Sequence, residues 1–516
     1  MAAVERMDRR RFLLAMAGAA AGGGLVACGG AGSNRQARGP TDADWRRLAG
    51  RLDGRLVRPD DPSYGAARQL YDLLFDDVRP EAIALCSKAR DVAACIGFAQ
   101  QHEVPAAVRS GGHSYGGYST GSGLVIDVTR MATVQVDTAA GTAVVGAGTR
   151  LIDLYAQLAQ QGVLVPGGSC PTVGIAGLTL GGGFGVLSRK YGLTADNMLS
   201  AEVVLADGRL VTCDAKTEPD LFWALRGGGG GNFGVVTSFT FRVHGLPQLA
   251  LGTLRWPWER AAEVITAWQE WAPQAPDEFW ANCVLQSHPD QSPPLLQVGA
   301  TYTGPVADLQ DQLAALSDRV GGSPSLNQAS GSGYLDAMLF EAGCGGMTVA
   351  QCHLPSENPA GRLSRAGLVA ASDYFDRPLP EAGAEALATA VSRRAASPQL
   401  GQGGIVVDAD GGAMNRVAPD ATAYVHRSAL GSLQYVGNWQ SGDASPTVDA
   451  NRAWVQESWQ AMRAYVDGGA YQNYVDPSLK DWQQAYYGQN LARLRAIKRQ
   501  YDKGNFFHFA QSIPPA

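Results

Sequence analysis

Two glycine-rich stretches decide the fold: Arg109-Ser-Gly-Gly-His-Ser-Tyr-Gly-Gly-Tyr118 and Pro166-Gly-Gly-Ser-Cys-Pro-Thr-Val-Gly174. Two more follow, Gly181-Gly-Gly-Phe-Gly185 and residues 227–234. Glycine lets backbone N–H groups approach an anionic ligand closely, and it tolerates positive φ. Tight turns in a β-rich fold would explain one such stretch. Four stretches within residues 109–234 predict a large, flat, phosphate-bearing ligand.

Residues 229–234 also match the G-x-G-x-x-G pattern of dinucleotide-binding folds. The match fails on context, because that fingerprint leads from a strand into a helix. Here the segment follows a short helix-like piece and precedes an expected strand at residues 235–239. No GxxxxGK[ST] phosphate loop occurs in the sequence either. Neither of these two nucleotide-binding folds is predicted.

Length and charge exclude some classes of protein. The 516 residues suggest two or three domains, or one domain with a large insertion. The formal net charge of −6 argues against nucleic-acid binding, which needs a basic face. No run of 18 or more strongly apolar residues occurs, so no transmembrane helix is expected.

The first half mixes short strands and helices, as an α+β domain for a nucleotide-type ligand would. Asp91 can cap a helix, and Asp207-Gly208 predicts a hairpin. Strands are expected at residues 83–85, 106–109, 124–128, 134–137, 142–146, 202–205, 209–213 and 234–244, and a helix at residues 151–161.

The sequence pattern changes from residue 249 onward. Strand-like pieces alternate with amphipathic stretches at residues 307–320 and 382–396, and residues 424–439 are strand-rich. A second domain is therefore expected over residues 249–467. A final segment, residues 468–516, carries a helix from residue 490 to about residue 501.

The N-terminus predicts export. Asp8-Arg9-Arg10-Arg11-Phe12 and the weakly apolar stretch after it resemble a twin-arginine signal over residues 1–27. Leu25-Val26-Ala27-Cys28 resembles a bacterial lipobox, which would make Cys28 the lipidated residue; the alternative is an ordinary signal with a chance cysteine. Residues 28–57 would form a tether and a leading helix. We expect an extracytoplasmic protein, lipid-anchored or secreted, that uses the twin-arginine machinery and touches membrane only through that anchor.

The eight cysteines predict a disulfide and no metal site. No CxxC pair and no Cys/His cluster with zinc spacing occurs. Cys344 and Cys352 lie eight residues apart in a glycine-containing loop, where an extracytoplasmic disulfide is expected. Cys86 and Cys95 are a weaker pair, because each can be an ordinary buried residue.

Several motifs together resemble one family, the berberine-bridge-enzyme-like flavin oxidases of the vanillyl-alcohol-oxidase/PCMH superfamily. The motifs are residues 109–115, 168–174, 178–197 and 226–236, and Tyr486-Tyr487-Gly488 with residues 490–502. The resemblance runs from about Arg58 to the C-terminus. It departs once, because Asp502-Lys503-Gly504-Asn505 stands where the family usually has Asp-Pro-x-Asn.

The resemblance implies an α+β fold with two domains. Residues 58–248 would form a PCMH-type FAD-binding domain of two α/β subdomains, completed by residues 468–516. Residues 249–467 would form an α+β substrate domain with an antiparallel sheet.

The cofactor implied by the resemblance is FAD, bound covalently at two points. His113 would be bonded to the 8α-methyl group and Cys170 to C6. Taken alone, either residue has an ordinary explanation, a hydrogen-bonding loop histidine or a small buried thiol. The further cofactor-binding residues expected are Arg109, Ser110, Gly111, Gly112, Ser114, Tyr118, Gly168, Thr172, Val173, Gly174, Gly177, Gly181, Gly182, Gly183, Gly185, Asp196, Asn197, Val236 and Asn473.

The catalytic base implied by the resemblance is Tyr474, in the motif Tyr471-Gln-Asn-Tyr474-Val-Asp476. A tyrosine with its ordinary pKa of ~10 needs a positive neighbour or a second hydrogen-bonding partner to act as a phenolate. The alternative is a packing aromatic. Gln434 and Tyr435 are weaker catalytic candidates on a strand whose residues 432, 434, 436 and 438 share one face. Ser432 stands where plant members carry a glutamate, and Asp408 is expected to be structural.

The reaction implied is removal of hydride from a substrate hydroxyl to flavin N5, with a base that takes the hydroxyl proton. Val173 occupies the family's oxygen-gating position, so O2 is the expected acceptor and H2O2 the product. The substrate would be a sugar, a glycoside or a secondary metabolite. Two alternatives keep the flavin, a dehydrogenase with another acceptor and an oxidative cyclase. A third has no flavin: a substrate-binding lipoprotein.

Overall fold

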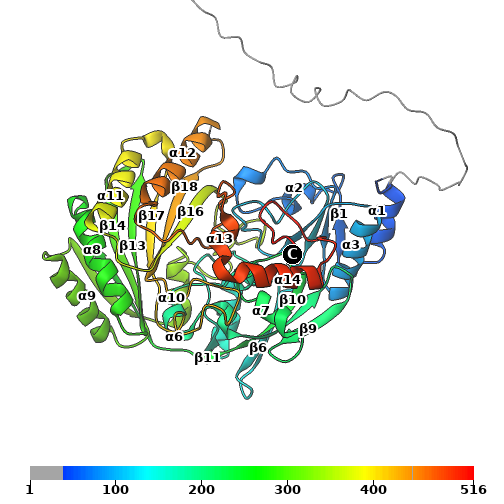
Figure 1. Ribbon diagram of the computed structural model, residues 1–516, viewed down its shortest axis with the longest axis horizontal. Coiled ribbons are helices and arrows are strands. Elements are labelled where there is room, and N and C mark those ends of the chain that lie inside the picture. The colour runs from blue at the N-terminus through cyan, green and yellow to red at the C-terminus, as the bar shows by residue number, and fades with distance from the viewer. Residues whose placement is uncertain (1–38, 444) are drawn as a thin grey trace, which may run out of the picture. The chain divides into compact units, whose positions relative to one another are not determined.

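The computed structural model describes residues 39–443 and 445–516 of the chain (Figure 1). The predicted export signal and Cys28 lie outside these residues. Within the described ranges, no helix is both long and apolar enough to cross a membrane.

The first domain begins with a small mixed sheet of strand order β1-β2-β4-β3. Strands β2, β4 and β3 are parallel, and β1 runs antiparallel to β2. The elements here are α1 (Asp42–Ala49), β1 (Arg55–Val57), α2 (Tyr64–Ala67), β2 (Ala82–Leu85), α3 (Ala89–Gln101), β3 (Ala106–Arg109) and β4 (Leu124–Asp127). Because β1 pairs with β2, the domain starts ahead of residue 58, where the sequence analysis placed its boundary.

The helix expected to be capped by Asp91 begins two residues earlier, at Ala89. Asp91 therefore lies in the first turn and not at the cap position. Its carboxylate accepts hydrogen bonds from the backbone N–H groups of Ser87 and Asp53, both at 2.8 Å. The residue thus satisfies backbone donors at the helix start and fixes the chain next to β1.

A second, antiparallel sheet has the order β5-β6-β10-β8-β9. The predicted hairpin at Asp207-Gly208 is confirmed, with Gly208 at φ +82°. The elements are β5 (Val134–Asp137), β6 (Thr142–Gly146), α4 (Leu151–Gln160), α5 (Ile175–Leu180), α6 (Ser188–Tyr191), β8 (Met198–Val204), β9 (Leu210–Asp214), α7 (Pro219–Ala224) and β10 (Val235–Arg242), with β7 (Val163–Leu164) and β11 (His244–Gly245) paired apart. Residues 229–234 join α7 to β10, the helix-to-strand order that argued against a dinucleotide fingerprint.

The second domain is one seven-stranded antiparallel sheet of order β15-β12-β14-β13-β17-β18-β16. Its strands are β12 (Leu249–Arg255), β13 (Phe279–His288), β14 (Gln291–Tyr302), β15 (Leu326–Ser332), β16 (Gly367–Phe375), β17 (Gly403–Ala409) and β18 (Gly431–Trp439). One face carries α8 (Ala261–Trp271), α9 (Val306–Val320), α11 (Glu381–Ala395) and α12 (Ser445–Met462), as Figure 1 shows. A short helix, α10 (Tyr334–Glu341), precedes β16.

Residues 424–430 are not part of a strand, so the expectation of a strand-rich segment over 424–439 is correct only for β18. The chain leaves the sheet here because Tyr424 and Arg427 turn toward the first domain. The backbone N–H of Tyr424 bonds to the carbonyl of Arg226 at 3.1 Å.

The C-terminal segment packs on the first domain through α13 (Trp482–Tyr487) and α14 (Leu491–Tyr501). Lys498 on α14 is fully buried, and its ammonium donates to the carbonyls of Asn232 and Phe507, each at 2.6 Å. Asp502 accepts the third bond at 2.7 Å. One cation thus ties the segment to the glycine-rich loop before β10.

The predicted disulfide is present, joining Cys344 to Cys352 in the connection between α10 and β16. Cys86 and Cys95 are buried and not joined.

Candidate active site

A cavity of about 680 Å³ lies where the glycine-rich stretches of the first domain meet the C-terminal segment. A cavity of this volume can hold a large cofactor. Most of the predicted cofactor-binding residues line it: Ser110, Gly111, Gly112, His113, Ser114, Tyr118, Gly168, Cys170, Val173, Gly174, Gly177, Gly185, Val236 and Asn473. Tyr474 lines it too. The stretches singled out in the sequence therefore converge on one site.

His113 is held from two sides. Its Nε2 lies 2.8 Å from the hydroxyl of Thr172, and its ring stacks on Tyr71 with centroids 4.3 Å apart. Burial, with the nearby Arg150 cation, lowers the pKa of His113 to about 3. The imidazole is therefore neutral at physiological pH, and Nδ1 is the ring nitrogen that Thr172 does not engage.

Cys170 is solvent-accessible and lines the cavity. Burial raises the pKa of its thiol. Its charge, if formed, would also raise the pKa values of Tyr71 and Tyr115. His113, which stacks on Tyr71, and Cys170 thus occupy the same end of the cavity.

Tyr474 lies at that end as well. Its ring is parallel to that of Tyr115 at 5.9 Å and edge-on to that of Tyr471 at 5.0 Å. Burial raises its pKa well above the ordinary value, and the charge of Asp408 raises it further. Because each of these causes disfavours the phenolate, Tyr474 is a phenol at neutral pH.

The cavity fits a polar ligand with flat and anionic parts. The hydroxyls of Tyr118, Ser119 and Thr120 are buried against it without a partner among the described residues, a costly state unless a ligand supplies one. A Cβ added to Gly177 would meet no atom within 4 Å, so this backbone is open to a close ligand. FAD has phosphates and flat rings. It therefore needs hydrogen-bonding groups without other partners and a backbone that it can approach closely, and this cavity has both.

Three glycines predicted to bind the cofactor, Gly181, Gly182 and Gly183, do not line the cavity. A Cβ on Gly181 would lie 2.0 Å from the Asn473 amide oxygen, and one on Gly183 would lie 2.5 Å from the Thr194 hydroxyl. These glycines are therefore required by close packing beside the site. Thr172 also lies outside the lining, and acts on the site through His113.

Arg109 is likewise structural: it is buried, and its guanidinium donates to the carbonyls of Ala67 at 2.6 Å and Ser119 at 3.2 Å. Asn197 is structural too, because its amide nitrogen donates to the Leu193 carbonyl at 2.9 Å and its oxygen contacts His244 at 2.7 Å. Neither lines the cavity, so the structure gives both residues contacts within the fold where the prediction gave them direct contact with the cofactor.

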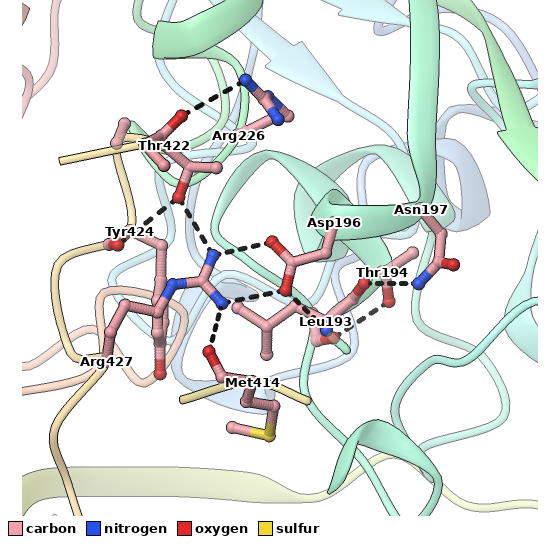
Figure 2. A network of polar contacts seen from close by, with 12 residues as sticks. Leu193, Thr194, Asp196, Asn197, Arg226, Met414, Thr422, Tyr424 and Arg427 are labelled. Atoms are coloured by element: carbon pink, nitrogen blue, oxygen red, sulfur yellow. Dashed lines mark hydrogen bonds and ion pairs between the residues drawn. The ribbon is translucent and has the colours of Figure 1, made fainter. Parts of the chain in front are cut away.

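Asp196 does not reach the cavity either, and Figure 2 shows what it does instead. Its two carboxylate oxygens accept a forked pair of bonds from Arg427, at 2.7 and 2.8 Å. Arg427 also donates to the carbonyl of Met414 at 3.0 Å and to the hydroxyl of Thr422 at 3.0 Å. Because Asp196 belongs to the first domain and Arg427 to the second, this motif residue joins the domains.

The two weaker catalytic candidates have different places in the structure. Gln434 lies on the face of β18 turned toward the first domain, and its amide donates to the Tyr115 hydroxyl at 3.2 Å. Tyr435 points to the opposite face, into the core beneath α11 and α12, where it donates to Asp373 at 2.9 Å. Strand alternation separates the two neighbours, so Tyr435 is not an active-site residue.

Comparison with known proteins identifies the family. A family model described as an FAD binding domain matches residues 80–214, and one described as berberine and berberine like matches residues 470–514. YgaK, an uncharacterized FAD-linked oxidoreductase of Bacillus subtilis (strain 168), is 34% identical over 477 residues, covering 90% of this chain and 98% of its own. The chain belongs to the berberine-bridge-enzyme-like family of FAD-linked oxidoreductases.

Solved structures of similar proteins support the same fold. A chitooligosaccharide oxidase is 27% identical with a TM-score of 0.81, covering 92% of this chain and all, 100%, of its own. Phl p 4, a grass pollen allergen with glucose dehydrogenase activity, is 26% identical with a TM-score of 0.80, covering 92% and 99%. An Ile→Val variant of Phl p 4 is described as a glucose oxidase. This berberine-bridge-enzyme-like protein is thus an FAD-dependent oxidoreductase, which excludes a flavin-free binding lipoprotein.

Sequence reasoning missed several residues of the site. Tyr115 stood inside a recognised motif, yet only the structure shows that it lies between Gln434 and Tyr474. Asp408 was expected only to be structural, and its charge also raises the pKa of Tyr474. Ser119, Thr120 and Phe509 line the cavity without a motif that could have identified them.

Proposed function

We propose that this enzyme oxidises a hydroxyl group of a sugar, glycoside or related metabolite. The observation that carries the proposal is that His113, Cys170 and Tyr474 line the same cavity. FAD, when bound, supplies the acceptor for the hydride of the C–H bond. Tyr474 accepts the hydroxyl proton, and Gln434 with Tyr115 orients the substrate beside it.

Tyr474 is a phenol before reaction, so its role requires an outlet for its own proton. Asp408 is the candidate acceptor, because it lies opposite Ser432 on the sheet face that Gln434 shares, and its charge acts on Tyr474. Burial and the Glu341 carboxylate raise the pKa of Asp408 to about 7. A group with this pKa is about half ionised near neutrality. We therefore propose a proton path from substrate hydroxyl to Tyr474 and on to Asp408.

The substrate is tested by a peroxide screen. Purified protein is mixed with mono- and oligosaccharides, glycosides and simple alcohols, and H2O2 is measured with a peroxidase dye. Turnover of a carbohydrate supports the proposal. Flavin reduction without peroxide would favour the dehydrogenase alternative, and a cyclised product would favour an oxidative cyclase.

We propose that FAD is linked covalently to both His113 and Cys170. The neutral imidazole and the cavity-facing thiol support this. Each linkage replaces one C–H bond of the flavin and one N–H or S–H bond of the protein by a C–N or C–S bond. The two hydrogens so removed reduce O2 to H2O2, which balances the reaction.

Removal of both attachment residues is expected to abolish covalent flavin. The wild-type pellet after acid precipitation should stay yellow, while the pellet of the His113→Ala/Cys170→Ala variant should be colourless. Each single variant should retain one linkage, located by peptide mapping. A colourless wild-type pellet with a yellow supernatant would show that FAD binds without either bond.

We propose O2 as the electron acceptor, because Val173 lines the cavity next to Cys170. The Phl p 4 variant supports the idea that a valine can accompany oxidase activity. Val173→Ile adds one methylene group and should slow reoxidation of the reduced flavin by O2 by about 10-fold or more without slowing its reduction by substrate. Stopped-flow mixing with aerated buffer measures both. Equal reoxidation rates would contradict the gating role.

We also propose that the protein is exported by the twin-arginine route and anchored through Cys28. The Arg9-Arg10 pair and the Cys344–Cys352 disulfide support an extracytoplasmic location. Fractionation of cells expressing the wild type and Cys28→Ser tests it: loss of the membrane-bound fraction in the variant is expected.

A further inference from the structure

The connection between α10 and β16, residues 342–366, reaches toward His113 through Thr172. Arg150, the residue before α4, pairs with Glu357 of this connection at 3.0 Å. Arg150 also donates to the carbonyl of Thr172 at 3.2 Å. The hydroxyl of the same Thr172 lies 2.8 Å from His113 Nε2. Glu357 is thus connected to the imidazole of His113 through two intervening residues, Arg150 and Thr172.

The same connection holds the other side of the imidazole. Arg365 donates to the carbonyl of Leu70 at 2.6 Å and pairs with Asp76 at 3.1 Å. The backbone N–H of Leu73 bonds to the carbonyl of Ala366 at 3.2 Å. These contacts fix the segment that carries Tyr71, whose ring stacks on His113.

The disulfide fixes this connection against α4. Cys344 and Cys352 are fully buried and pack against Ile152 of that helix. His353, the next residue, contacts the Asp153 carboxylate at 3.1 Å. The covalent bridge therefore stands directly behind the helix whose N-terminal flank is Arg150.

We propose that residues 342–366 act as a clamp that positions His113 for its bond to the flavin. Glu357 and Arg365 are the positioning residues, and the Cys344–Cys352 disulfide keeps the clamp in place. This inference rests on the proposed covalent linkage at His113. None of Glu357, Arg365, Cys344 and Cys352 lines the cavity, so they affect the orientation of His113 and not the binding of FAD itself.

The decisive variant is Glu357→Gln, which keeps the size of the side chain and removes the charge that holds Arg150. A small misorientation of reacting groups costs on the order of 10- to 100-fold in rate. We therefore expect the His113 linkage to form at least about 10-fold more slowly than in the wild type. The full chain is expressed with limiting riboflavin, incubated with FAD in air, and sampled by acid precipitation and peptide mapping.

Asp220→Asn is the control, because it removes a carboxylate from the 2.8 Å ion pair of Asp220 with Arg493, and neither residue lines the cavity. It should attach flavin at the wild-type rate. The Cys344→Ser/Cys352→Ser variant should resemble Glu357→Gln. All variants should keep the wild-type affinity for FAD, measured by flavin fluorescence.

Three results would overturn the inference. Wild-type attachment at His113 in Glu357→Gln would show that the clamp is not needed, while the proposed function stands. Equal slowing at His113 and Cys170, with a lowered melting temperature, would show general loosening instead of positioning. A wild-type protein without acid-stable flavin would overturn the covalent linkage and the clamp together.

Discussion

Tyr474→Phe is expected to leave FAD bound and to slow flavin reduction by substrate by about 10²- to 10⁴-fold. The substitution removes one hydroxyl and keeps the ring that packs between Tyr115 and Tyr471. In the proposed reaction the hydride leaves the substrate as its hydroxyl proton departs, so loss of the proton acceptor raises the barrier of this step. Anaerobic stopped-flow spectroscopy of the flavin measures the rate directly.

Tyr501→Phe is the matched control, because its hydroxyl bonds to Glu218 outside the cavity, at 2.5 Å. It should reduce at the wild-type rate. Normal reduction in Tyr474→Phe would show that Tyr474 only packs in the site. In that case Asp408 or bound water would have to take the proton.

The pH dependence tests the second half of the same proton path. Asp408 must be ionised to accept the Tyr474 proton, so flavin reduction should rise as pH increases through about 7 and level off above it. Asp408→Asn should lower the maximal rate of flavin reduction and remove the rise of this rate with pH. If the rate of the variant still rises with pH as in the wild type, another group titrates and Asp408 has only a structural role.

Much of this site could be predicted from the sequence, because its motifs are local. Residues 109–118 and 166–174 are short glycine-rich loops, and a loop that must bring its backbone to a ligand carries that requirement in its own residues. His113, Cys170, Val173 and Tyr474 all line the cavity as expected. The antiparallel sheet of the second domain and the α+β class were also correctly predicted.

The structure departs from the predicted site where a motif residue contacts parts of the chain that are distant in sequence. Gly183 and Asn197 stand in the same recognised stretch, yet both support its packing. Tyr435 and Gln434 are neighbours on β18 and face opposite sides of the sheet, so their roles depend on the register of the strand to within one residue. The charge of Asp408 raises the pKa of Tyr474 from a strand more than sixty positions earlier, an effect that no local sequence pattern encodes.

Asp196 is the clearest case, and its partner gives the largest expected effect on stability. Arg427 is fully buried and makes four hydrogen bonds, two of them to Asp196 (Figure 2). Arg427→Met keeps an unbranched, flexible side chain but removes the guanidinium, and the Asp196 carboxylate, whose side chain is 11% exposed, loses its partner. Removing one partner of a buried pair costs about 3–5 kcal/mol. We expect a loss of this size in the free energy of unfolding, measured by urea titration.

Arg416→Met provides the comparison within the same segment. Arg416 pairs with Asp277, but its side chain is 61% exposed, and exposed pairs contribute about 0–1 kcal/mol. The two substitutions are chemically identical, so the difference between them measures what the burial of Arg427 and its additional bonds to Met414 and Thr422 contribute. Arg427→Lys separates charge from geometry: it restores a cation without the planar fork that meets both oxygens of Asp196, and it should recover only part of the loss. If Arg427→Met unfolds as Arg416→Met does, Asp196 does not join the domains energetically, and the reason for its presence in the motif must be sought in the cofactor after all.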